Sequence, residues 1–229
     1  MNTSRRQFTL AGTAAALGAT FGSLPARANT ADEANTLVER ATATVNAFAG
    51  NADYGALPGL LGKAKGVLVY PRIIEGGFIL GGAGGSGVLL VRDAKTGAFH
   101  GPAFYTMGGV SIGFLAGGQA AEVIMLVNSD NALNTLLSSS VKLGAAASVA
   151  AGPRGAGEGA AITTDFTSFS RNRGAFASMS FNGQVIGVRE TLNVGFYGKP
   201  VTPVDILITR TVTNPAADSL RAALKAIAK

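Results

Sequence analysis

Two short motifs in the sequence have the spacing of catalytic or nucleotide-binding signatures. Gly109-Val110-Ser111-Ile112-Gly113 matches the G-x-S-x-G nucleophile elbow, which in α/β-hydrolases is followed along the chain by an acid and then a histidine. The only histidine, His100, precedes Ser111, so an exposed serine in a strand is favoured. Residues 82–87 match G-x-G-x-x-G, but a strand-like run follows them instead of the helix that would hold a pyrophosphate. We therefore interpret them as a glycine-rich hairpin.

The sequence holds no stronger catalytic or metal-binding pattern. It has no cysteine, which excludes disulfides, thiolate metal sites and iron–sulfur clusters, and a single histidine excludes a multi-histidine metal centre. His100 stands before Gly101-Pro102, where we expect a polar strand–turn junction; a pH-sensitive or ligand-contacting role is the alternative. We predict a non-enzymatic protein with no catalytic residue, no metal and no cofactor. An enzyme with an unfamiliar site is the third hypothesis, behind the two developed below.

The remaining candidate functional residues are small groups of basic side chains. Lys63, Lys65 and Arg72 flank the first expected strand, and Arg171 and Arg173 would point to one face of an extended segment. They are either ordinary solvated surface or a platform for phosphate headgroups and other anions. At about 1 kcal/mol each, the first three would give roughly 3 kcal/mol, less than the about 4.1 kcal/mol of a millimolar dissociation constant. Useful binding would also need apolar insertion or a shaped headgroup pocket.

The N-terminus has the form of an export signal. Arg5 and Arg6 lie in a Ser-Arg-Arg-x-Phe pattern that resembles the twin-arginine signal, and a weakly apolar stretch leads to Ala26-Arg27-Ala28. A membrane anchor is the alternative, because about 20 residues can span a bilayer. We predict that residues 1–28 are a signal peptide cleaved after Ala28. The protein would then be periplasmic or secreted, or peripheral at a membrane.

The rest of the chain, residues 29–229, is expected to form one α+β domain. Of 229 residues, 47% are hydrophobic and 14% are charged, which excludes a disordered chain. Apolar spacing predicts helices over about 31–49, a turn at 57–61, a short helix after residues 128–130 and a terminal helix after Asn214-Pro215. Between them, short apolar runs separated by glycine-rich turns predict a large antiparallel sheet that could curl toward a barrel. The expected strands are 67–70, 78–80, 88–91, 103–105, 110–115, 123–127, 145–150, 175–181 and 185–188, with a hairpin at Asn182-Gly183.

The net positive charge of this domain is small. Residues 1–28 hold three of the 19 Lys and Arg residues and no acid, so the domain has 16 bases against 13 acids. We expect no nucleic-acid partner. An outer-membrane barrel is disfavoured because only 7% of residues are aromatic and none is tryptophan.

Several segments, in order along residues 35–225, resemble the SYLF domain, also described as the actin-binding domain of yeast endocytic SH3 proteins. The first is Lys65-Gly66-Val67-Leu68-Val69-Tyr70-Pro71, similar to the family's K-G-V-L-V-F-P signature. The others are residues 85–92, 101–109, 148–153, 168–174, 197–203 and 205–207.

The resemblance implies binding to acidic phospholipid, since eukaryotic members bind phosphoinositides with the help of an amphipathic N-terminal helix and some bundle actin. Actin is not expected as a partner of an exported protein. The helix at 31–49 carries three acids against Arg40 alone, and so lacks the basic face of a helix that lies on anionic membrane. Candidate headgroup ligands are Lys63, Lys65, Arg72, Arg171, Arg173 and Lys199. The rival hypothesis is an interaction module that contacts another envelope protein or itself.

Overall fold

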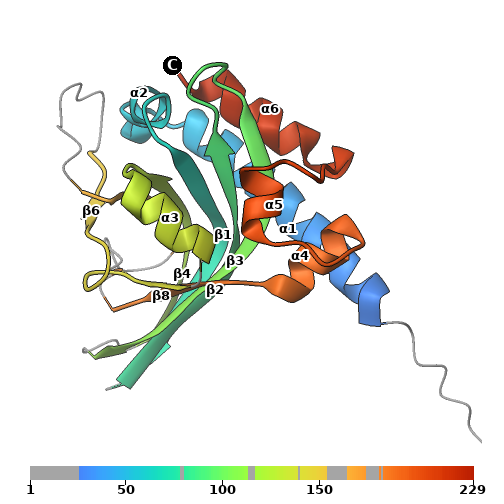
Figure 1. Cartoon of the computed structure of the whole chain (residues 1–229). Coiled ribbons are helices and arrows are strands. Elements are labelled where there is room, and N and C mark those ends of the chain that lie inside the picture. Colours follow the sequence, from blue (N-terminus) through green and yellow to red (C-terminus); the bar gives the residue numbers. More distant parts are fainter. Residues whose placement is uncertain are drawn as a thin grey trace, which may run out of the picture.

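The computed structural model describes residues 26–77, 80–112, 117–138, 140–153, 164–173, 181 and 183–229. In these residues eight strands form one curled, half-barrel sheet with the order β5-β8-β3-β2-β1-β4-β7-β6 (Figure 1). The strands are β1 (Gly66–Gly77), β2 (Leu80–Arg92), β3 (Phe99–Ile112), β4 (Gly117–Val127), β5 (Ser140–Lys142), β6 (Val149–Ala151), β7 (Phe166–Arg173) and β8 (Val185–Val188). The α-helices are α1 (Ala26–Ala49), α2 (Leu57–Leu61), α3 (Asp130–Ser138), α4 (Glu190–Tyr197), α5 (Pro203–Leu207) and α6 (Asp218–Ile227). The chain also forms two short 3-10 helices, η1 (Ala52–Tyr54) and η2 (Pro215–Ala217), in its described part.

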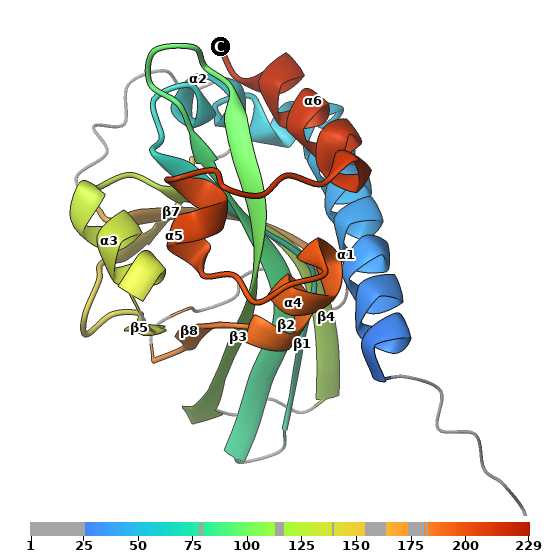
Figure 2. The ribbon, with the colours of Figure 1, turned by 45° about the vertical axis from the view of Figure 1, so that its right-hand side comes forward.

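The central strands are buried on both faces. Val67 and Val69 of β1 pack into one apolar cluster with residues of α1, α4 and α6, whereas Leu68 and Tyr70 pack into a second cluster with residues of α3 and α5. Successive side chains of a strand point to opposite faces, so each strand feeds both clusters. This explains the continuous apolar runs of the sequence. Figure 2 shows α1 and α6 side by side over one face, with α3 and α5 on the other.

The four long strands continue past the helices at one end of the molecule (Figure 1). There β1 pairs with both β2 and β4, and Gly76 stands between Gly82 and Gly118. Residues 82–87, interpreted above as a glycine-rich hairpin, lie inside β2, which pairs antiparallel with β1, and not in a turn. Glycine offers no side-chain alternation to reveal a strand.

The helices with clear periodicity are confirmed. Helix α1 ends as predicted at Ala49, although it begins at Ala26, five residues before the predicted start. Ser129 caps α3 by accepting a hydrogen bond from the Ala132 amide at 3.0 Å. Asn214 accepts from the Ala216 amide at 2.9 Å, and Pro215 opens η2, which leads directly into α6.

Other expectations need correction in the second half of the chain. Of the expected strand at 145–150, only the last two residues belong to β6, while residues 145–146 form a turn and Ala147 makes an isolated bridge with Leu143. Residues 190–197 form α4 and residues 203–207 form α5, where the sequence predicted no helix. The strand at 185–188 is confirmed as β8. The predicted strand at 175–181 and Asn182 of the hairpin lie outside the described residues, except Phe181, which is not in a strand. The strand order of the sheet also departs from the chain order, since β4 returns to pair with β1.

Candidate anion-binding groove

A bulge in β1 presents Arg72 to solvent. The pairing of β1 with β4 shifts between Tyr70 and Ile73, and its pairing with β2 shifts between Val69 and Ile74. Pro71, which has no amide hydrogen to donate to a ladder, lies within the irregularity. A bulge bends the strand and re-aims its side chains, and here the side chain of Arg72 is exposed.

Glycine at position 85 makes this bulge possible. A Cβ atom at Gly85 would lie 2.3 Å from the carbonyl oxygen of Arg72 and 3.1 Å from Cα of Ile73. Any larger residue on β2 would therefore push the bulge away from the sheet. The glycine-rich stretch thus has a local structural role, which is close approach of two backbones.

Helix α1 supplies the opposite wall of a groove over this bulge. Its buried face consists of Ala34, Val38, Ala41, Val45 and Phe48. A second face, at helical spacing, lines the groove with Asn29, Asp32, Glu33, Thr36, Leu37 and Arg40. The floor comes from Pro71, Arg72, Ile74 and residues 84–86, and the groove has a volume of about 520 Å³. This is within the usual range of ligand pockets, about 300–1,000 Å³.

Two arginines that line the groove form no ion pair among the described residues. Glu33 accepts from Nη1 of Arg189 at 2.8 Å, and the same nitrogen donates to Oγ of Ser86 at 2.7 Å. Arg189 thus links α1 to β2, and its ion pair neutralises Glu33. Among the described residues Arg40 and Arg72 form no ion pair, so the groove offers two guanidinium groups against Asp32. An anion is the ligand that such a groove would favour.

An exposed apolar side chain accompanies these charges. Among the described residues, Ile74 is the most exposed large hydrophobic residue, with 52% of its surface accessible. It lies two residues after Arg72 on the floor of the groove. The arrangement therefore offers anion binding beside a side chain that would gain from leaving water.

A smaller cavity lies on the other side of the bulge. It has a volume of about 290 Å³ and is lined by Pro71, Arg72 and residues 120–122. Glu122 of β4 pairs in register with Arg171 of β7, and Nε of Arg171 donates to Oε2 of Glu122 at 2.6 Å. Arg72 and Arg171 are thus brought to the same level of the sheet, but the charge of Arg171 is already matched by a carboxylate.

The other predicted headgroup ligands are spread over the molecule. Lys63 is exposed in the turn after α2, and Lys65 pairs with Asp130 at 3.1 Å just before β1 begins. Arg72 is the seventh residue after Lys65, a distance of about 20 Å along an extended strand. Lys199 is exposed after the end of α4. Arg173 belongs to β7, but its side chain lies outside the described residues. The six residues therefore do not form one cluster around Arg72.

Sequence reasoning did not include Arg40 and Ile74 in the site. Arg40 is the only base of the helix predicted at 31–49, and it lies on a face separate from the apolar stripe, which was the available signal. Ile74 gave no signal, because its exposure results from the bulge.

The described residues contain neither a metal-binding cluster nor a helix that could span a membrane. They hold no group of three or more His, Cys, Asp or Glu side chains that could bind a metal ion. None of the helices in the described part combines the length and hydropathy needed to cross a bilayer. The side chain of Ser111 lies outside the described residues, although its backbone belongs to β3.

Comparison with known proteins connects the chain to a single family. Residues 108–227 match the family model Ysc84, described as Las17-binding protein actin regulator. Protein YSC84 of Saccharomyces cerevisiae is 32% identical over 176 residues, which cover 74% of this chain and 37% of that protein. LAS seventeen-binding protein 3 of the same yeast is 31% identical over 176 residues, covering 74% of this chain and 38% of the relative.

Animal proteins are similar over nearly the same part of the chain. Human SH3 domain-containing YSC84-like protein 1 is 29% identical over 166 residues, covering 70% of this chain and 48% of the relative. The chain thus spans between about a third and a half of the length of these relatives. No solved structure matches it significantly.

Proposed function

The chain belongs to the Ysc84 family, also called SYLF, and we propose that it is an exported, non-enzymatic member that binds acidic phospholipid headgroups at a membrane surface. The groove between α1 and the β1 bulge carries this proposal. It supplies the shaped anion pocket that the scattered basic residues of the sequence lack.

The free energies of charged hydrogen bonds indicate that two arginines acting together could hold a phosphate group. A hydrogen bond to a charged group contributes about 1.5–3 kcal/mol, so Arg40 and Arg72 on one phosphate would give about 3–6 kcal/mol. This range includes the about 4.1 kcal/mol of a millimolar dissociation constant. Burying the exposed part of Ile74 in the interfacial region would add about 1 kcal/mol. Binding to an anionic surface then becomes measurable without a basic N-terminal helix.

The test is co-sedimentation of the protein with phosphatidylcholine vesicles, with and without phosphatidylglycerol. We expect binding only with the anionic lipid, and we expect Arg72→Glu to weaken it about tenfold or more, since one charge-assisted contact is lost. The matched control is Lys142→Glu, the same change of charge at an exposed residue of β5, four strands from β1. Equal losses in the two variants would contradict a site at the groove.

Export is a separate part of the proposal, and it predicts a defined N-terminus. Cleavage after Ala28 would leave Asn29 as the first residue and would remove only three residues of α1 as described. Mass spectrometry of the protein from a host with twin-arginine transport should therefore find Asn29 first. An intact leader in the membrane fraction would refute cleavage.

A second candidate function is an interaction module without lipid specificity. It is favoured by the description of the family, Las17-binding protein actin regulator, and by the name of the yeast relative LAS seventeen-binding protein 3. Salt distinguishes the two candidates, because headgroup binding weakens with ionic strength and an apolar protein contact does not.

A further inference from the structure

A small cavity at the opposite end of β3 from the glycine-rich strand ends is lined by basic groups. It has a volume of about 220 Å³, and its lining comes from Phe99, His100, Gly101, Ile206, Arg210, Val212, Thr213 and Arg221. Every ionisable residue in this lining is a base, and they come from β3, the loop after α5, and α6. The volume is below the usual range for drug-sized ligands, about 300–1,000 Å³. Only a small ligand would fit.

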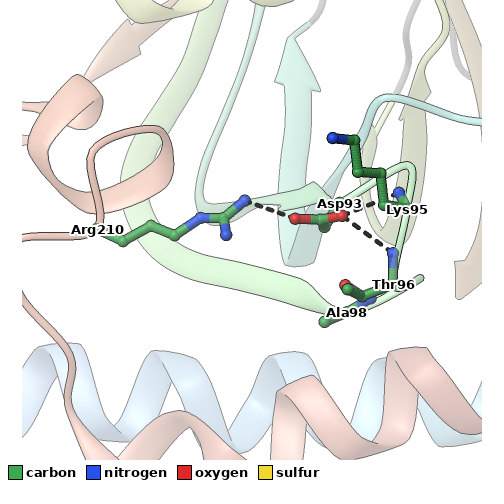
Figure 3. A network of polar contacts seen from close by, with 5 residues as sticks. All are labelled: Asp93, Lys95, Thr96, Ala98 and Arg210. Atoms are coloured by element: carbon green, nitrogen blue, oxygen red, sulfur yellow. Dashed lines mark hydrogen bonds and ion pairs between the residues drawn. The ribbon is translucent and has the colours of Figure 1, made fainter.

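Arg210 occupies this cavity wall with an uncommon backbone conformation. Its φ is 57°, the only positive φ of a non-glycine residue in the described chain. Such a conformation costs about 1 kcal/mol or more for a side chain without a local hydrogen bond and is often kept at functional sites. Here it directs the guanidinium toward the β2–β3 turn, where Nη2 donates to Oδ2 of Asp93 at 3.0 Å (Figure 3).

Asp93 is itself held by the turn. Its Oδ1 accepts from the backbone amides of Lys95 and Thr96 at 2.9 and 3.0 Å (Figure 3). The bond from Thr96, then that from Arg210, and then that from Lys95 keep the pKa of Asp93 well below its ordinary value. The carboxylate therefore stays charged and orients Arg210. Within the part of the chain that the structure describes, the remaining guanidinium nitrogens of Arg210, Nε and Nη1, have no hydrogen-bond partner.

Arg221 is fixed on the other side of the cavity. Its Nη1 donates to the carbonyl of Gly101 at 2.7 Å, and its Nη2 donates to the carbonyl of Asn214 at 3.1 Å and also pairs with Asp218. The guanidinium is thus oriented before any ligand arrives. Such preorganisation lowers the entropic cost of binding.

His100 contributes an unsatisfied polar atom. Its Nε2 is buried and has no hydrogen-bond partner among the described residues. Burial, then the charges of Arg210 and Arg221, lower the pKa of His100, while Asp93 acts in the opposite direction. A bound anion would supply both a partner for this nitrogen and a charge that favours its protonation.

From this geometry we infer that the cavity between β3, the loop after α5, and α6 is a binding site for a small oxyanion of the phosphate class, held by Arg210, Arg221 and His100. The phosphate could be free or could be the terminal phosphate of a phosphomonoester lipid. The site is separate from the groove at the β1 bulge, so either can fail without the other.

The single histidine makes the test direct, because the full chain gives one imidazole Cε1–H signal in a proton NMR spectrum. Titration with inorganic phosphate at constant ionic strength should shift this signal saturably. By linkage, phosphate should also raise the pKa of His100. A signal that does not shift saturably at tens of millimolar phosphate would overturn the inference.

Two variants locate the effect. Arg210→Gln should weaken phosphate binding about fivefold to tenfold through loss of a charged donor. Arg210→Gly should weaken it as much while leaving the chain at least as resistant to heat, because glycine adopts a positive φ without strain. Lys95→Gln removes the same charge from an exposed residue of the β2–β3 turn and should leave the affinity unchanged. An unchanged affinity in both Arg210 variants would overturn the inference.

Vesicles separate the two sources of phosphate. If a lipid phosphomonoester is the ligand, vesicles that contain phosphatidic acid should displace inorganic phosphate from the His100 signal, and phosphatidylcholine vesicles should not. If free phosphate is the ligand, neither kind of vesicle should affect the signal. Both results support the oxyanion site, since both require the saturable phosphate shift.

Discussion

Asp165 links three segments of the chain through one side chain. Its Oδ1 accepts from the hydroxyl of Ser129, which caps α3, and its Oδ2 accepts from the amide and the hydroxyl of Ser148 at 3.0 Å. Asp165 directly precedes β7, and Ser148 directly precedes β6. One carboxylate thus holds the starts of α3, β6 and β7 together.

Loss of this carboxylate should change how stability depends on pH. The bond from Ser129, followed by the bonds from Ser148, lowers the pKa of Asp165 in the folded protein. A group with a depressed folded pKa stabilises above its unfolded pKa, about 3.9, and loses that contribution as pH falls through the folded pKa. Asp165→Asn should therefore cost about 1 kcal/mol at pH 7 and lose less stability on acidification below pH 4.

Urea denaturation at pH 7, 4 and 3 measures this difference. Asp53→Asn is the control, since the side chain of Asp53 is exposed and accepts no hydrogen bond described in the structure. Parallel loss of stability in the wild-type protein and the Asp165 variant would show that the network has no effect on acid unfolding.

The contact between α1 and α4 depends on the absence of a side chain. A Cβ atom at Gly195 of α4 would lie 2.8 Å from Oγ1 and 2.9 Å from the carbonyl carbon of Thr30 in α1. Because one of these neighbours is backbone, the helices would have to separate. The same two helices form walls of the apolar cluster on this face of the sheet.

Gly195→Ala should therefore destabilise the protein although alanine is the better helix former. The overpacking cost, about 1–3 kcal/mol, exceeds the gain in helix propensity of about 1 kcal/mol. Gly59→Ala in α2 is the matched control, since nothing lies within 4 Å of its added Cβ, and it should be neutral or stabilising. Thermal unfolding of both variants tests the sign. Stabilisation by Gly195→Ala would mean that α1 and α4 are not held this closely.

The sequence predicted the helices and strands whose apolar side chains recur at regular spacing. It did not predict features that depend on residues distant in the sequence. The stripes of α1 and α6 and the apolar runs of β1 and β4 carry their own periodicity. The bulge of β1 does not, because it needs Gly85 of another strand to approach Arg72. Arg72 was therefore predicted as a ligand, while its groove and its neighbour Arg40 were not.

Across the whole molecule, the basic residues divide into those that can touch a bound headgroup and those that can only attract it. Arg72 lines the groove, whereas Lys63 is exposed in the turn before β1, and the first residue of β1 is already about 20 Å from Arg72 along the strand. That separation is about twice the screening length at 0.1 M salt. The two residues should therefore respond differently to ionic strength.

We expect Lys63→Glu to weaken vesicle binding at about 50 mM salt and to have almost no effect at about 300 mM, where screening removes its long-range attraction. Arg72→Glu should remain defective at both concentrations, because a direct contact with the headgroup is lost and a like charge replaces it. Co-sedimentation of both variants with vesicles that contain phosphatidylglycerol, across this salt range, measures the difference. If the defect of Arg72→Glu faded in parallel with that of Lys63→Glu, Arg72 would act only through the general field of the protein, and the groove would not be a headgroup site.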